Sequence, residues 1–258
     1  DSPNDYMQVY RNGELLTSTD NKTDESEKER FHNANVYYIG KFSDKLQVNV
    51  DADYVYSRLN HWQLVTETSR IDAAQEITHI QNDQRNRAAA FKGVLAWTVN
   101  ESSGFDFGTD FSKISSWGTS VNEEGKIADD RFKNNETKYA GFVSYRLFSE
   151  KWKGSVGLRY EYVHAINTDQ GEVKNRNDYS DLLPSLSLST SLGKVELNLD
   201  FSSRVNRPSF RQLNNSVSYN NQYHYEQGNI YLKPQYVYDA EFSLDYGILD
   251  FKVDYQYI

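Results

Sequence analysis

The feature that most constrains the fold is a repeated alternation of apolar and polar side chains. Residues 195–202 show it clearly, because every odd position is apolar and every even position is polar. A β-strand points successive side chains to opposite faces, so each such segment has one apolar and one polar face. The alternation predicts about ten strands, in residues 36–42, 46–56, 89–99, 105–111, 139–147, 156–162, 184–192, 195–201, 240–246 and 249–257.

The connections between these segments are alternately short and long. The short ones are Ser43–Lys45, Asn100–Gly104, Ser149–Lys151, Gly193–Lys194 and Gly247, and the long ones are residues 58–86, 114–136, 166–181 and 204–235. Outer-membrane barrels have short periplasmic turns and longer extracellular loops. The segments, of roughly ten residues, match the ~9–11 residues of a membrane-crossing strand. We therefore expect an all-β, antiparallel up-and-down meander of about ten long strands, part of a transmembrane outer-membrane β-barrel.

The aromatic residues support this prediction. The chain has 20 Tyr and 13 Phe, although its mean hydropathy is −0.79. In a membrane barrel only alternate residues contact lipid, and aromatic rings gather at both interfaces. Two such belts are expected, an outer one at Tyr54, Tyr56, Tyr160, Tyr162, Tyr255 and Tyr257, and one beside the short turns at Phe42, Trp97, Phe105, Phe148, Trp152 and Tyr246.

Composition limits the other possibilities. The net charge of −9 and the lack of a basic run argue against a nucleic-acid partner. There is no cysteine for a disulfide or thiolate site, and no apolar run approaches the ~18 residues of a transmembrane helix. The charged stretch Asp20–Arg30 is expected to be a solvated loop. We divide the chain into an N-terminal loop or partial strand (1–32) and a barrel segment (33–258).

Two motifs suggest a family. Residues 203–214 read SRVNRPSFRQLN, and residues 228–235 read GNIYLKPQ. Together they resemble the barrel of TonB-dependent outer-membrane receptors, especially the Bacteroidetes-type outer membrane protein β-barrel family. That family's pattern is R-x-N/S-R-P-S/D-F/Y-x-x-L-N-P, then G-N-P-x-L-K-P-E before another strand. This chain departs from it at Asn215, Ile230 and Gln235.

The resemblance implies energy-coupled uptake of a scarce solute, such as a siderophore, cobalamin, a glycan or a peptide. It also implies a Gram-negative outer membrane, with lipid, a plug domain and the TonB system as partners. No plug sequence is recognisable, and the strands number about half of those in such receptors. We therefore expect a section of a larger barrel, without deciding whether it closes or self-associates through its edges.

The ligand-binding residues that we predict lie in the fourth long connection, which is rich in Arg and Tyr. They are Arg204, Arg207, Arg211, Tyr219 and Tyr223. Arginines can bind an anionic ligand or a plug domain, but they can equally pair with carboxylates such as Glu226 and Asp239. Both interpretations remain open from the sequence.

No catalytic or metal-binding pattern is apparent, so neither an enzyme nor a cofactor is expected. The five histidines are isolated and lack the spacing of a zinc site: His32, His61, His79, His164 and His224. Two alternatives are a soluble β-sandwich that acts in adhesion or glycan binding, and an outer-membrane barrel enzyme with a catalytic cluster at its rim.

Overall fold

The computed structural model describes residues 4–210, 212–213 and 217–258. Arg211 lies outside them. Thirteen strands occupy most of this part of the chain: β1 (Asn4–Arg11), β2 (Glu14–Ser43), β3 (Leu46–Ser69), β4 (Gln75–Asn100), β5 (Ser103–Asn122), β6 (Asp130–Phe148), β7 (Trp152–Asp169), β8 (Glu172–Leu192), β9 (Val195–Asn206), β10 (Val217–Asn221), β11 (His224–Gln227), β12 (Gln235–Tyr246) and β13 (Leu249–Tyr257).

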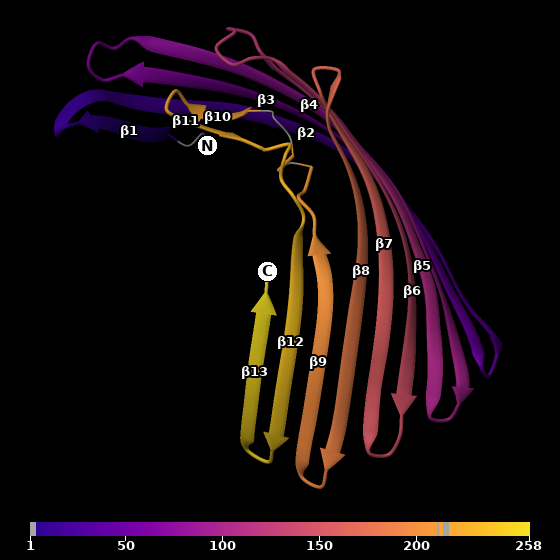
Figure 1. The fold of residues 1–258 in the computed structure, drawn as a ribbon. Helices are drawn as coiled ribbons and strands as arrows, with labels where there is room; N and C mark the ends of the chain where they lie inside the picture. Colours follow the sequence, from indigo (N-terminus) through magenta and orange to yellow (C-terminus); the bar gives the residue numbers. More distant parts are fainter. Residues whose placement is uncertain (1–3, 211, 214–216) are drawn as a thin grey trace.

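Eleven of these strands form one antiparallel meander. Their order is β1-β2-β3-β4-β5-β6-β7-β8-β9-β12-β13, so each strand pairs with its neighbours in the chain except where β10 and β11 intervene. Figure 1 shows a single curved layer, with β1 and β13 as its two edges. The predicted meander is confirmed. The β-sandwich alternative is wrong, because no second large sheet packs on this layer within the described residues.

The prediction of a loop at Asp20–Arg30 is wrong, because β2 runs without a break from Glu14 to Ser43. The physical reason lies in the alternation of charge. Glu25, Glu27 and Glu29 occupy one face of the strand, and Lys28 and Arg30 occupy the other. A strand whose two faces are both charged has no apolar alternation, although its backbone still forms a complete ladder with β3.

Three of the four predicted long connections are mostly strand. β3 continues to Ser69 and β4 starts at Gln75, and the ladder also extends beyond the apolar rows in β5–β6 and β7–β8. These extensions mix apolar and polar side chains on both faces, so the regular alternation ends before the hydrogen bonding does. The five predicted short turns are all present. Residues 204–235 remain a long connection that contains the small β10–β11 sheet.

Strand register assigns the faces of the sheet. Residues directly opposite in an antiparallel pair share a face. One outward row therefore joins Leu46, Trp97, Phe105, Tyr145, Val156 and Leu186. Within it the rings of Phe105 and Tyr145 lie 5.0 Å apart. The concave face carries polar residues instead, such as Gln47, Asn49, Asp51 and Asp53 of β3.

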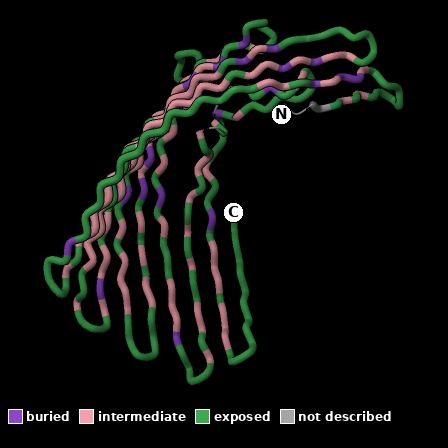
Figure 2. The backbone as a smooth tube through the Cα atoms, turned by 180° about the vertical axis from the view of Figure 1, so that it is seen from behind, coloured by how far each residue is buried: buried purple, intermediate pink, exposed green. Residues whose placement is uncertain are grey.

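Few side chains are buried, and they do not form one central core. Figure 2 shows short buried stretches along the strands, separated by intermediate and exposed ones. Large apolar side chains remain exposed on the outward face, for example Val36 (71%) and Phe42 (65%). An apolar outward face is typical of a wall that contacts lipid. Among the described residues no helix is long and apolar enough to cross a bilayer.

Candidate ligand-binding site

The connection between β9 and β12, residues 204–235, folds back over the concave face of the sheet. Its first anchor is Arg207, which lies just beyond the end of β9. The Arg207 guanidinium donates to Glu161 on β7 at 2.9 Å and to Asp181 on β8 at 2.8 Å. Both carboxylates are buried. Tyr236 also donates its hydroxyl to Asp181, at 2.7 Å.

Arg207 thereby joins a network of alternating charges on the inner wall. Asp110 of β5 lies 2.6 Å from Arg159 of β7, and Arg159 lies 2.8 Å from Glu161. Alternating signs compensate each buried charge with an opposite one, which is the condition for keeping charged groups in a partly dehydrated wall. The network therefore fixes the start of the 204–235 connection to three wall strands.

A second anchor holds the β10–β11 sheet against β3. The hydroxyl of Tyr219 donates to the buried carboxylate of Glu67 at 2.6 Å, and the backbone N–H of Gln222 donates to the same carboxylate at 3.1 Å. Burial, and then the hydrogen bond to Glu67, raise the pKa of Tyr219. Tyr219 also packs with Val65 and Ile80 in a small apolar cluster. Figure 1 shows β10 and β11 beside the outer parts of β2 and β3.

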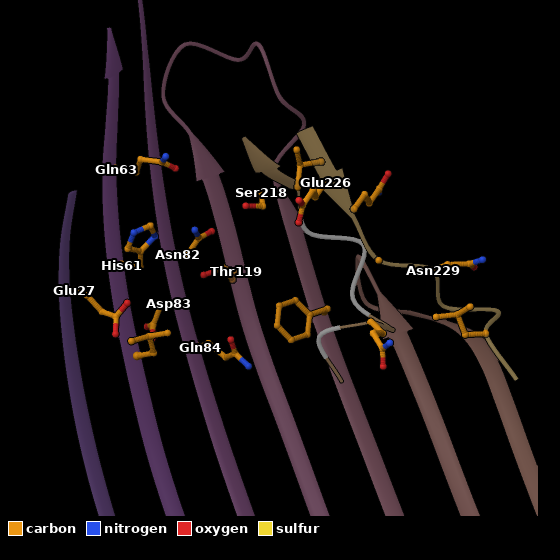
Figure 3. A pocket seen from close by; sticks show the side chains of 17 residues that line it. Glu27, His61, Gln63, Asn82, Asp83, Gln84, Thr119, Ser218, Glu226 and Asn229 are labelled. Atoms are coloured by element: carbon orange, nitrogen blue, oxygen red, sulfur yellow. The ribbon is translucent and has the colours of Figure 1, made fainter. Parts of the chain in front are cut away.

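Between these anchors the wall and the connection border an open cavity of about 670 Å³. Figure 3 shows His61, Gln63 and Asn82 on wall strands facing Ser218 and Glu226 of the connection. The remaining lining residues are Glu27, Leu59, Asp83, Gln84, Thr119, Phe132, Gln212, Val217, Gln227, Gly228, Asn229 and Leu232.

The charged side chains of the lining are acidic, and most of its other described side chains are polar, beside apolar ones such as Phe132 and Leu232. Its described members include the carboxylates of Glu27 and Glu226, but no lysine or arginine. Amide and hydroxyl groups from five elements can donate to or accept from a ligand. Such a lining suits a hydrogen-bonding solute without concentrated negative charge. In the described part of the chain no group of three or more His, Cys, Asp or Glu side chains could hold a metal ion.

The predicted ligand-binding residues lie elsewhere. Arg204 forms an ion pair with Asp239. Pairing with a carboxylate of the protein was one of the two interpretations that the sequence left open for the arginines. Arg207 and Tyr219 form the two anchors, and Tyr223 is exposed (52%) near the β10–β11 turn. None of these four lines the cavity. Their part in ligand binding stays a prediction, and Arg211 lies outside the described residues.

Sequence reasoning missed the lining residues of the wall. His61, Gln63 and Asn82 lie in segments that were expected to be loops, so they were not assigned to a face. A continued count of every second residue from Gln47 along β3 would have placed His61 and Gln63 on the concave face. No sequence signal shows that residues 217–229 return to meet them.

Comparison with known proteins decides the family. Residues 40–258 match the outer membrane protein β-barrel family. The chain belongs to this family. The expected resemblance to barrels of TonB-dependent receptors is confirmed, and this family member lies in the outer membrane of a Gram-negative bacterium. No curated protein matches the sequence significantly.

Solved receptors share the fold at low sequence identity. The ferric preacinetobactin receptor BauA of Acinetobacter baumannii is 11% identical, with a TM-score of 0.51; the alignment covers 92% of this chain and 37% of BauA. The ferric-catecholate import receptor Fiu of E. coli K12 is 13% identical, with a TM-score of 0.51; the alignment covers 90% of this chain and 39% of Fiu. This chain therefore spans well under half the length of either receptor.

Proposed function

We propose that this chain is the barrel portion of a TonB-dependent receptor for energy-coupled uptake of a scarce solute. The observation that carries the proposal is the cavity on the concave face, bordered by a connection that is anchored at both Arg207 and Tyr219. A wall that only formed a passive pore would have no need of a connection held across its mouth. A plug domain, the TonB system and outer-membrane lipid are the partners of the proposed receptor.

The cargo classes are a siderophore, cobalamin, a glycan or a peptide. The two similar receptors take ferric preacinetobactin and ferric catecholate, which supports a solute too scarce to enter by diffusion. Glu27 and Glu226 are carboxylates among the described lining residues, and they would repel a polyanion, which favours members of these classes that hydrogen-bond through neutral groups.

An uptake assay tests the proposal. Cells that lack the gene are given labelled ferric siderophores, cobalamin, oligosaccharides and peptides, with and without a protonophore. We expect uptake of one cargo class to be lost, to return with the gene, and to vanish when the protonophore removes the energy source. Uptake of every cargo at the same rate with and without the gene would contradict the proposal.

A blocking substitution tests the cavity itself. Asn82→Trp places a large ring in the cavity, and Asn60→Trp places the same ring on the outward face of β3. We expect Asn82→Trp to raise the KM of uptake by about tenfold, which corresponds to ~1.4 kcal/mol of lost binding. Asn60→Trp should leave KM unchanged. Equal KM values of uptake for both variants would show that the cavity does not bind the cargo.

We also propose that the chain catalyses no reaction. The alternative is an outer-membrane barrel enzyme such as a lipase or protease. Purified protein in detergent is incubated with a chromogenic ester and a quenched peptide. Turnover of either probe, abolished by a serine-directed or acid-protease inhibitor, would favour the enzyme; no turnover supports the receptor.

A further inference from the structure

The outward face carries a row of cations across five strands. The register places Arg30 of β2 opposite Arg58, Arg58 opposite Arg85, Arg85 opposite Trp117, and Trp117 opposite Lys133 of β6. Directly opposed residues share a face, so these side chains form one row with a single aromatic member. The face is the outward one, because Arg58 and the lipid-facing Val48 and Val50 are all even positions of the unbroken strand β3.

The adjacent rows on the same face are basic too. Arg87 and Lys113 lie on the two rows nearer the short turns, and Lys28 and Arg131 lie on the next row outward. We call the eight cations the basic band: Lys28, Arg30, Arg58, Arg85, Arg87, Lys113, Arg131 and Lys133. On these four rows of β2–β6 Asp83 is the one carboxylate. Such a concentration is unexpected by chance in a chain with a net charge of −9.

The cations of the basic band are poised to meet an external anion. Asp83 lies 2.8 Å from Arg58 and 3.3 Å from Arg85, so it partly compensates those two. Lys28, Arg30, Lys113, Arg131 and Lys133 are exposed, and the ion pairs that Asp83 forms on this face are with Arg58 and Arg85 instead. The guanidinium of Arg85 lies 5.0 Å from the centre of the Trp117 ring, and that of Arg87 lies 5.8 Å from the Tyr56 ring.

The height of the basic band matches the outer surface of the membrane. Twelve residues separate Leu46, at the lowest outward apolar position of β3, from Arg58. At ~3.3 Å per residue and a tilt of about 40°, this is ~30 Å along the membrane normal. The apolar band of outer-membrane barrels is only about 25 Å tall. The row of Arg58 therefore lies just beyond the hydrocarbon, whereas Arg87 and Lys113 lie level with Tyr56 and Tyr54 of the outer tyrosine belt.

We propose that the basic band binds phosphate groups of the anionic glycolipid in the outer leaflet. Arginine offers paired N–H donors to phosphate oxygens, and lysine adds point charge. The surface is continuous with the lipid-facing wall, so a lipid whose acyl chains lie along Val50 and Phe91 presents its head group at this level. The concave face of β2 carries Glu25, Glu27 and Glu29, which would repel these phosphates.

Lipid retention tests this proposal in the protein purified from outer membranes. The variant Arg30→Gln/Arg87→Gln/Lys113→Gln/Lys133→Gln removes four cations of the basic band. The control Lys41→Gln/Lys45→Gln/Lys151→Gln/Lys194→Gln removes four cations beside the short turns. Native mass spectrometry counts bound lipid A that carries two phosphates, and the same lipid after enzymatic removal of both phosphates.

We expect the first variant to retain less than one tenth of the phosphorylated lipid bound by the wild type. A single substitution such as Arg30→Gln should weaken binding about fivefold, since a basic residue near an anionic surface contributes ~1 kcal/mol. This single variant also serves if the fourfold one fails to fold. The proposal is overturned if the fourfold variant of the basic band or Arg30→Gln retains as much phosphorylated lipid as the wild type. It is also overturned if the control loses as much lipid as the fourfold variant, or if the wild type binds the dephosphorylated lipid equally well.

Discussion

Tyr219 is one of the two residues whose side chains anchor the 204–235 connection to the wall, the other being Arg207. Tyr219→Phe removes the hydroxyl that donates to Glu67 and leaves that buried carboxylate with the Gln222 N–H as its remaining described donor. An unsatisfied buried acceptor costs ~1–3 kcal/mol. We expect hydrogen exchange of residues 217–227 to accelerate by about fivefold or more, while exchange in β6 and β7 stays unchanged.

Tyr223→Phe is the matched control for that experiment. Its hydroxyl makes no hydrogen bond to a described group, and half of its surface is exposed. The expected change in local stability is within ~0.5 kcal/mol. If both substitutions accelerate exchange equally, the Tyr219–Glu67 contact does not hold the connection in place.

Glu124 makes the loop between β5 and β6 sensitive to acid. Its carboxylate accepts from the backbone N–H of His79 at 2.7 Å and from the Asn122 side chain at 3.1 Å, and it also contacts the His79 ring. Partial burial raises its pKa, but the hydrogen bonds from His79 prevail and lower the pKa of Glu124 from 4.5 to about 2.

The direction of the effect follows from this lowered pKa. A carboxyl group with a folded-state pKa below its unfolded value stabilises the fold above the unfolded value, and this stabilisation is lost as pH falls through the folded one. We therefore expect the amides of Lys126 and Ile127, which Asn122 holds, to lose protection between pH 4.5 and 2. Hydrogen exchange corrected for intrinsic rates measures this. Glu124→Gln should flatten the profile, and an unchanged profile would contradict the assignment.

Among the wall elements, the close approach of β5 and β6 depends on glycines beneath aromatic rings. A Cβ on Gly108 would lie 2.1 Å from the ring of Phe142, its direct partner on β6. The guanidinium of Arg159 lies 5.9 Å from the centre of that ring, so a shift of the ring would disturb the charge network of the inner wall. Gly108→Ala should destabilise the barrel by ~1–3 kcal/mol, as overpacking does.

Urea unfolding in detergent, followed by tryptophan fluorescence, measures this loss. Gly141→Ala is the control on the same pair of strands. Its Cβ would meet nothing closer than 3.9 Å, so its unfolding midpoint should match that of the wild type. Equal unfolding midpoints for all three proteins would show that the Phe142 ring moves aside without a loss of stability.

The strands differ in how far the sequence could predict them. Where one face contacts lipid, as in residues 46–56, apolar and polar side chains must alternate, so the sequence predicts the strand. Beyond Tyr56 apolar side chains occur on both faces of β3, at Val65 as well as Leu64, so the continuation to Ser69 left no regular alternation to follow. The contact of Tyr219 with Glu67 joins residues 152 positions apart and depends on the curvature of the whole sheet, which periodicity does not encode.

For the molecule as a whole, the alternation of short turns with long hairpins sets an orientation in the membrane. Short turns are periplasmic in outer-membrane barrels, so Lys45 and Ser149 should face the periplasm, while Asp72 and Glu123 should face the medium. All four positions are exposed. The chain contains no cysteine, so single cysteine substitutions can be labelled without background.

We expect a membrane-impermeant maleimide to label Asp72→Cys and Glu123→Cys on intact cells. Lys45→Cys and Ser149→Cys should react only after the outer membrane is permeabilised. The basic band depends on the same orientation, because its cations lie between the apolar rows and the Asp72 turn. Labelling of Lys45→Cys on intact cells would show that the sheet has the opposite orientation in the membrane. The basic band would then lie at the periplasmic surface, and its anionic partner would be lipid of the inner leaflet. The labelling pattern thus fixes which lipid leaflet the eight cations can meet.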